Sequence, residues 1–189
     1  MSAERILVTY ATRTGSTRGV AEAIGAVLAE GGALVDVLPM QAVSDVSPYA
    51  AVVAGSAIQN KQWLPEALAF VNAHRATLSR KPFAAFLVCM TLAMRQGGTY
   101  RGFVSDFMAP VRALVRPVSE GLFAGALDIG AMPSWSDRLQ FQISVWLGVW
   151  SRGDHRDWEA IRAWARDLRR HLSVAAPTEA KVRLPGVDA

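Results

Sequence analysis

Four hydroxyl side chains occur within six residues, at Thr12, Thr14, Ser16 and Thr17, and Gly15 lies among them. An apolar segment typical of a buried strand precedes them, and a segment of helical period follows. Hydroxyl groups donate to phosphate oxygens, glycine lets the backbone approach a ligand, and the free N–H groups of a helix start attract anions. Simple helix capping is the alternative, but one hydroxyl is enough for that. The pattern therefore favours a phosphate-binding loop.

The loop differs from the two common nucleotide-binding motifs. Neither G-x-x-x-x-G-K-[ST] nor G-x-G-x-x-G is present in the chain. A nucleoside triphosphate or a dinucleotide is therefore a poorer candidate ligand than a smaller phosphate ester.

Short apolar segments alternate with helical segments along the chain. Strands are predicted at Ile6–Tyr10, Ala33–Leu38, Ala50–Ala54, Phe83–Cys89 and Gly121–Ile129. Apolar residues at helical spacing predict helices that contain Val20–Leu28, Leu64–Val71, Phe103–Val115 (bent at Pro110) and Trp158–Leu172. This alternation predicts an α/β fold with a doubly wound five-stranded parallel sheet in the order 2-1-3-4-5.

The predicted sheet also locates the ligand. In doubly wound sheets, ligands bind beyond the carboxyl ends of the strands, at the point where the strand order reverses. We therefore expect the site after Tyr10, at the end of the first strand, and after Gly55, at the end of the third. We expect one domain over residues 1–174 and a disordered tail over residues 175–189, where apolar periodicity is lost.

The chain resembles the flavodoxin family at these places. The sequence Thr-x-Thr-Gly-x-Thr, which begins at Thr12, is similar to the flavodoxin loop that holds the phosphate of FMN. The resemblance continues over Gly55–Trp63, Ala124–Leu127 and Asp157–Glu159, and it is strongest to flavodoxin-type menaquinone-dependent protoporphyrinogen IX dehydrogenases. It implies a flavodoxin-like fold over about residues 5–172, with FMN as the cofactor.

The resemblance also implies which residues hold the cofactor. In the first loop these are Thr12, Arg13, Thr14, Gly15, Ser16 and Thr17, around the phosphate. Along the edge and the pyrimidine side of the flavin ring they are Ser56, Ala57, Ile58, Met90, Thr91, Leu92 and Ala93. Trp63 is placed either to stack on the ring or to anchor the following helix on the sheet. No side chain is identified as a general base.

Composition restricts the other possibilities. Cys89 is the only cysteine, and no histidine has a partner at metal-ligand spacing, so we expect no metal site. The N-terminus lacks the features of a signal peptide, so we expect a cytoplasmic protein. The net charge of +4 includes no long run of like charges, and we therefore expect no nucleic-acid partner.

Residues 133–150 are rich in tryptophan, and as a helix they would carry two apolar stripes. Three interpretations remain open for the segment Trp135–Trp150: a buried helix, a homodimer surface, or peripheral contact with the inner face of the membrane. Arginines follow it, at Arg152, Arg156, Arg162, Arg166, Arg169 and Arg170. They favour anionic lipid headgroups or an anionic tetrapyrrole substrate, unless they only form a solvated helix face.

Charge also bears on the role of the protein. The resemblance implies that electron-carrier flavodoxins are acidic, because they dock on basic reductases, whereas this chain has a pI near 9.7. We therefore predict an FMN-dependent oxidoreductase that passes electrons from a reduced substrate, protoporphyrinogen IX by the resemblance, to a quinone. A small electron-transfer flavodoxin with a redox partner and no organic substrate is the alternative. An interaction module without flavin is a weaker one.

Overall fold

The computed structural model describes residues 5–94, 97–127, 139 and 153–172. Its main sheet has five parallel strands in the order β2-β1-β3-β5-β6, with a short strand β4 paired to β3 outside this order. Since β4 is an addition, the order is the predicted 2-1-3-4-5, and the predicted fold class is confirmed. The strands are β1 (Arg5–Ala11), β2 (Leu34–Pro39), β3 (Ala51–Gln59), β4 (Gln62–Trp63), β5 (Phe83–Val88) and β6 (Ser119–Phe123).

The third strand is longer than predicted. Gly55 was expected to end it, but Gly55 stays within β3, paired with Tyr10 on one side and Phe86 on the other. A Cβ atom at Gly55 would lie 2.0 Å from Cζ of Phe86, so the glycine makes room for that ring. The prediction was wrong because a close contact within the sheet, not a turn, requires glycine here.

The fifth strand is divided, whereas the sequence predicted one strand to Ile129. β6 ends at Phe123, and β7 (Ala126–Leu127) pairs instead with β8 (Gly153–Asp154) in an antiparallel ladder. The neighbouring strand β5 ends at Val88, which pairs with Phe123, so the chain beyond Phe123 has no partner in the main sheet. Residues 128 and 129 lie outside the described residues.

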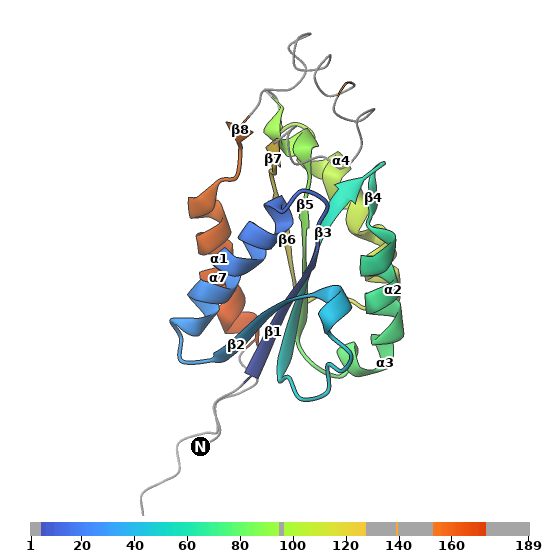
Figure 1. The fold of residues 1–189 in the computed structure, drawn as a ribbon, viewed down its shortest axis with the longest axis vertical. Helices are drawn as coiled ribbons and strands as arrows, with labels where there is room; N and C mark the ends of the chain where they lie inside the picture. The colour runs from blue at the N-terminus through green and yellow to red at the C-terminus, as the bar shows by residue number, and fades with distance from the viewer. Residues whose placement is uncertain (1–4, 95–96, 128–138, 140–152, 173–189) are drawn as a thin grey trace, which may run out of the picture.

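Helices cover both faces of the sheet, α1 and α7 on one face and α2 to α5 on the other (Figure 1). The helix that was predicted to bend at Pro110 is divided into α4, the short 3₁₀ turn η3 and α5. Pro110 lies in the first turn of α5, where a backbone N–H would have no partner within the helix, so proline causes little loss of stability. The helices are α1 (Ser16–Ala29), α2 (Pro65–Ala73), α3 (Arg75–Leu78), α4 (Arg101–Ser105), η3 (Asp106–Met108), α5 (Ala109–Leu114) and α7 (Trp158–Leu172).

The sheet separates two apolar clusters, as expected from the alternation of side chains along a strand. Leu7 of β1 belongs to the cluster beneath α2 and α5, while Ile6 and Val8 belong to the cluster beneath α1 and α7. In the second cluster, α1 and α7 also pack on each other. Ile161 and Leu168 of α7 are fully buried there, and each such side chain contributes about 1.5–3 kcal/mol.

Two predicted segments lie outside the described residues. They are the tail 175–189 and, except for Leu139, the tryptophan-rich segment Trp135–Trp150. Within the residues that the structure describes, no helix combines the length and apolar character needed to span a bilayer.

Candidate functional site

The predicted phosphate loop connects the carboxyl end of β1 to the first turn of α1, at the upper end of the sheet in Figure 1. Gly15 precedes the helix with φ of +86°, a left-handed conformation that favours glycine. In the described part of the chain, no side chain caps α1, so simple helix capping does not account for the hydroxyl groups. Thr12 instead organises the loop, because its Oγ1 accepts a hydrogen bond of 3.1 Å from N–H of Gly15.

Thr17 lies in the first turn of α1 and is completely buried. Its Oγ1 has no hydrogen-bond partner among the described residues. An unpaired buried hydroxyl destabilises a protein unless a ligand or water satisfies it. A phosphate ester at the start of α1 would satisfy it, so this residue fits the predicted cofactor.

Arg13 is directed toward α2. Its guanidinium forms a forked ion pair with both carboxylate oxygens of Glu66, in which Nη2 lies 3.1 Å from Oε2. Hydrogen bonding to Arg13 lowers the pKa of the Glu66 carboxyl below its usual range. Arg13 was predicted to hold the phosphate, but its charge is largely compensated by Glu66.

The second predicted segment lies at the end of β3. Ser56 is buried, and its Oγ accepts a hydrogen bond of 3.0 Å from N–H of Leu64 and donates one of 2.8 Å to the carbonyl of Ala57. Its side chain therefore fixes the start of α2 and leaves mainly backbone to face a ligand. Ala57 and Ile58 follow and are half-buried.

Trp63 lies in β4, which pairs with β3 through a two-residue turn at Asn60 and Lys61. Both turn residues have positive φ, which matches the twist of a tight hairpin. The turn carries Trp63 back into the core beneath α2, where it is only 1% exposed. This burial favours the anchoring interpretation over stacking on a flavin.

The third predicted segment forms a 3₁₀ turn, η2 (Met90–Ala93), directly after β5. All four residues are half-buried. Gly125 brings this turn and the phosphate loop together, because a Cβ on it would lie 3.2 Å from Sδ of Met90 and 3.6 Å from Oγ of Ser16. Three loops from β1, β5 and β6 thus meet at one point.

Arg156 also reaches this point, a role that the sequence alone did not indicate. Its Nη1 donates to the carbonyl of Ser16 over 3.4 Å, across 140 residues of chain. A backbone hydrogen bond of 3.2 Å from N–H of His155 to the carbonyl of Gly125 holds the same segment in place. No local pattern in the sequence identifies such a distant contact.

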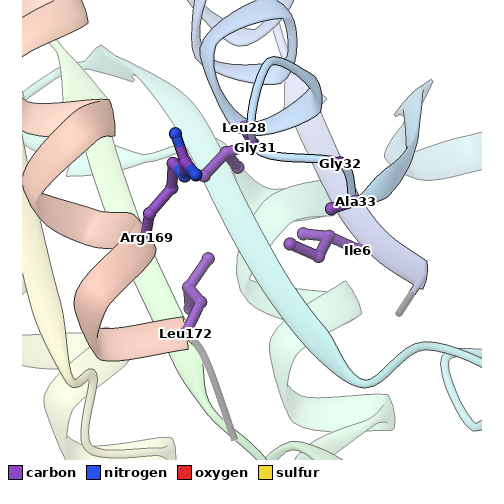
Figure 2. Close-up of a pocket in the computed structure, with 7 residues that line it drawn as sticks. All are labelled: Ile6, Leu28, Gly31, Gly32, Ala33, Arg169 and Leu172. Carbon is purple, nitrogen blue, oxygen red and sulfur yellow. The ribbon is translucent and has the colours of Figure 1, made fainter. Parts of the chain in front are cut away.

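Two of the pockets that the described residues form lie at opposite ends of the sheet. One adjoins η2, where Leu92 lines it. Figure 2 shows the other, at the amino ends of the strands, where ligands of parallel α/β sheets do not bind. In it, Arg169 of α7 points toward the turn at Gly31. Among the residues that the structure describes, no three His, Cys, Asp or Glu side chains are grouped to hold a metal ion, and Cys89 is buried.

The flavodoxin domain matches residues 7–151 of the chain. The chain belongs to the flavodoxin family. Because flavodoxins bind FMN, family membership means that this protein binds FMN. The fourteen site residues named from the sequence remain predictions, of which Thr17 fits best and Trp63 least.

Solved structures show the same fold. A short-chain flavodoxin associated with a PDU bacterial microcompartment has a TM-score of 0.58 and 16% identity, with 90% of this chain and 99% of that one covered. The flavodoxin of Streptococcus pneumonia TIGR4 has a TM-score of 0.53 and 16% identity, with 88% and 98% covered. No curated protein sequence gives a significant match.

Proposed function

We propose that this flavodoxin-family protein is an FMN-dependent oxidoreductase that takes electrons from an organic substrate and passes them to a quinone. The sequence resemblance points to protoporphyrinogen IX as the substrate. When bound, FMN supplies the capacity to accept and release an electron pair. The residues of the chain then have to bind the substrate, orient it toward the flavin and exclude water.

The observation that carries this proposal is a pocket beside the third flavin segment. It combines apolar side chains, such as Leu92 and Leu122, with the cation Arg101. An electron carrier needs only an exposed flavin edge, whereas an enzyme needs room for a substrate next to the flavin. The pocket is lined by Leu92, Gly97, Gly98, Arg101, Leu122, Phe123, Ala124, His155, Asp157 and Ala160.

Two exposed aromatic rings flank Arg101 in the sequence and support the same class of substrate. Tyr100 and Phe103 are 38% and 46% exposed, although rings of this size are usually covered. Nζ of Lys61, from the β3–β4 turn, lies 5.6 Å from the centre of the Phe103 ring. Flat apolar faces next to Lys61 and Arg101 suit a planar molecule with carboxylate groups, as the propionates of a tetrapyrrole would provide.

The alternative is an electron-transfer flavodoxin without an organic substrate. The fold and the FMN site are equally consistent with it. The net charge of +4 argues against docking on a basic reductase, since like charges repel. An acidic redox partner would remove this objection.

Anaerobic turnover tests the proposal. The purified holoprotein should oxidise protoporphyrinogen IX when a menaquinone analogue is supplied, followed by porphyrin fluorescence. Arg101→Leu should raise KM for the tetrapyrrole and leave FMN affinity unchanged. Arg75→Leu is the matched control, because Arg75 is an exposed arginine on α3, at the other end of the sheet. Absence of turnover, together with rapid electron exchange with a reductase, would establish the carrier instead.

A quinone acceptor also bears on location. We propose that the protein works in the cytoplasm and contacts the membrane surface peripherally, where quinones are held. The segment Trp135–Trp150, which lies outside the described residues, is the proposed contact. Sedimentation with anionic liposomes at low salt would support this membrane contact, and a molecular mass that rises with protein concentration would support the homodimer interpretation. If neither behaviour is observed, the buried-helix interpretation is favoured.

A further inference from the structure

Arg156 holds an unusual position at the start of α1. It follows β8, near the end of the described chain, and yet its Nη1 lies 3.4 Å from the carbonyl oxygen of Ser16. Ser16 is the first residue of the helix that the phosphate loop opens. Contact with its carbonyl places the guanidinium against the side of the first turn of α1, the turn that follows the predicted phosphate loop.

The guanidinium is fixed from two sides. Asp154 accepts two hydrogen bonds from it, of 2.7 Å from Nε and 2.8 Å from Nη2. The ring of Trp158 lies against its flat face, with 4.3 Å between Cζ and the ring centre. The side chain of Arg156 is consequently only 17% exposed. A forked ion pair and a stacked ring together hold the guanidinium in this position.

Gly19 supplies the space for this arrangement. A Cβ atom at Gly19 would lie 2.5 Å from Nη1 of Arg156 and 3.6 Å from the ring of Trp158. Gly19 lies inside α1, where glycine weakens a helix. The close approach of Arg156 explains why glycine occupies position 19, although glycine has a low helix propensity.

The charge of Arg156 is balanced by the Asp154 carboxylate, and the guanidinium lies against the first turn of α1. The start of a helix carries partial positive charge, which repels a cation and attracts an anion. Arg13, the cation within the phosphate loop, is paired with Glu66. Arg156 is paired as well, with Asp154, but it differs from Arg13 because its guanidinium also contacts the first turn of α1 through the carbonyl of Ser16.

We infer that Arg156 is a positioning residue of the FMN phosphate site, contributed by the chain after β8. It holds the first turn of α1 through the carbonyl of Ser16. The anchor formed by Asp154 and Trp158 keeps it there. FMN binding and the ordering of the β8 segment are thereby coupled.

Titration of the apoprotein with FMN and with riboflavin, which lacks the phosphate, tests this inference. In Arg156→Met, affinity for FMN should fall about tenfold or more, while affinity for riboflavin stays within about twofold. Arg170→Met is the matched control, since Arg170 lies at the far end of α7 and has the same charge. That variant should bind both flavins as the parent does.

Gly19→Ala provides a second test that does not remove a core contact. The new methyl group should push the guanidinium away from the first turn of α1, so FMN should bind more weakly while riboflavin affinity stays within about twofold. Hydrogen exchange gives a third readout, because FMN should slow exchange at the amides of His155 and Arg156, and Arg156→Met should abolish this effect.

Equal losses for FMN and riboflavin in Arg156→Met would show that the residue only supports the fold. Unchanged FMN affinity in both Arg156→Met and Gly19→Ala would overturn the inference outright. None of these measurements uses an organic substrate, so they are independent of the proposed enzymatic activity.

Discussion

Thr17→Val should change the stability of the apoprotein and its affinity for FMN in opposite directions. Thr17 is fully buried and its hydroxyl is unpaired within the described structure, an arrangement that costs about 1–3 kcal/mol. Valine has nearly the same shape and no polar atom. We therefore expect the apoprotein variant to gain about 1–2 kcal/mol, or about 2–4 °C in Tm for each kcal/mol in a domain of this size.

The same substitution removes a donor to the phosphate. A hydrogen bond to a charged oxygen contributes about 1.5–3 kcal/mol, which corresponds to a loss in FMN affinity of about ten- to a hundredfold. Thermal unfolding of the apoprotein and quenching of FMN fluorescence measure the two effects. A less stable apoprotein, or unchanged affinity, would refute the reasoning.

Thr9→Val is the matched control. Thr9 is also fully buried with an unpaired Oγ1, but it lies within β1, before the phosphate loop. Its replacement should stabilise the apoprotein by a similar amount and leave FMN affinity unchanged. If Thr9→Val also weakened FMN binding, the effect of Thr17→Val could not be assigned to the phosphate.

Three further predictions concern the stability of the fold. Gly55→Ala should lower the stability by about 1–3 kcal/mol, because the new Cβ meets the buried ring of Phe86, and a smaller residue at Phe86 should restore it in a double-mutant cycle. Arg156 lowers the pKa of Asp154 from 3.8 to about 2, so the ion pair should stabilise the protein above about pH 4 and lose this effect as pH falls toward 2. Because the Asp154 side chain is 41% exposed, solvent screening reduces its contribution to about 1 kcal/mol, and acid unfolding of Asp154→Asn measures it. Lys81→Met should cost about 1–2 kcal/mol in chemical denaturation, since Nζ of Lys81 donates to three backbone carbonyls at distances of 2.8, 3.3 and 2.6 Å; an unchanged denaturation midpoint would show that water replaces these bonds.

The sequence was sufficient to predict the sheet and most helices, because their signals are local. Val20 and Ile24 recur at helical spacing and are fully buried on α1. The errors have a common cause, which is contact between distant parts of the chain. Gly55 looked like a strand end, and only the ring of Phe86, across the sheet, explains it.

In the candidate site, too, the local features could be predicted from the sequence and the contacts between distant residues could not. The hydroxyl loop could be predicted because its four hydroxyls lie close together in the sequence and exceed what helix capping needs. The pairing of Arg13 with Glu66 spans 53 residues, and the contact of Arg156 with Ser16 spans 140, so neither leaves a periodic pattern in the sequence. The burial of Trp63 depends on a two-residue turn in which Lys61 has a positive φ, which is uncommon for a residue with a long side chain.

The packing of α1 on α7 has a consequence for biosynthesis. The first helix is made early, but the last helix, which covers part of its apolar face, emerges only when residues 158–172 have been translated. At about 5–20 residues per second, the roughly 140 residues between Ser16 and Arg156 take about 7–30 s to synthesise. During that interval, the apolar side of α1 that α7 later covers stays exposed. The nascent chain should therefore capture flavin only at the end of its synthesis.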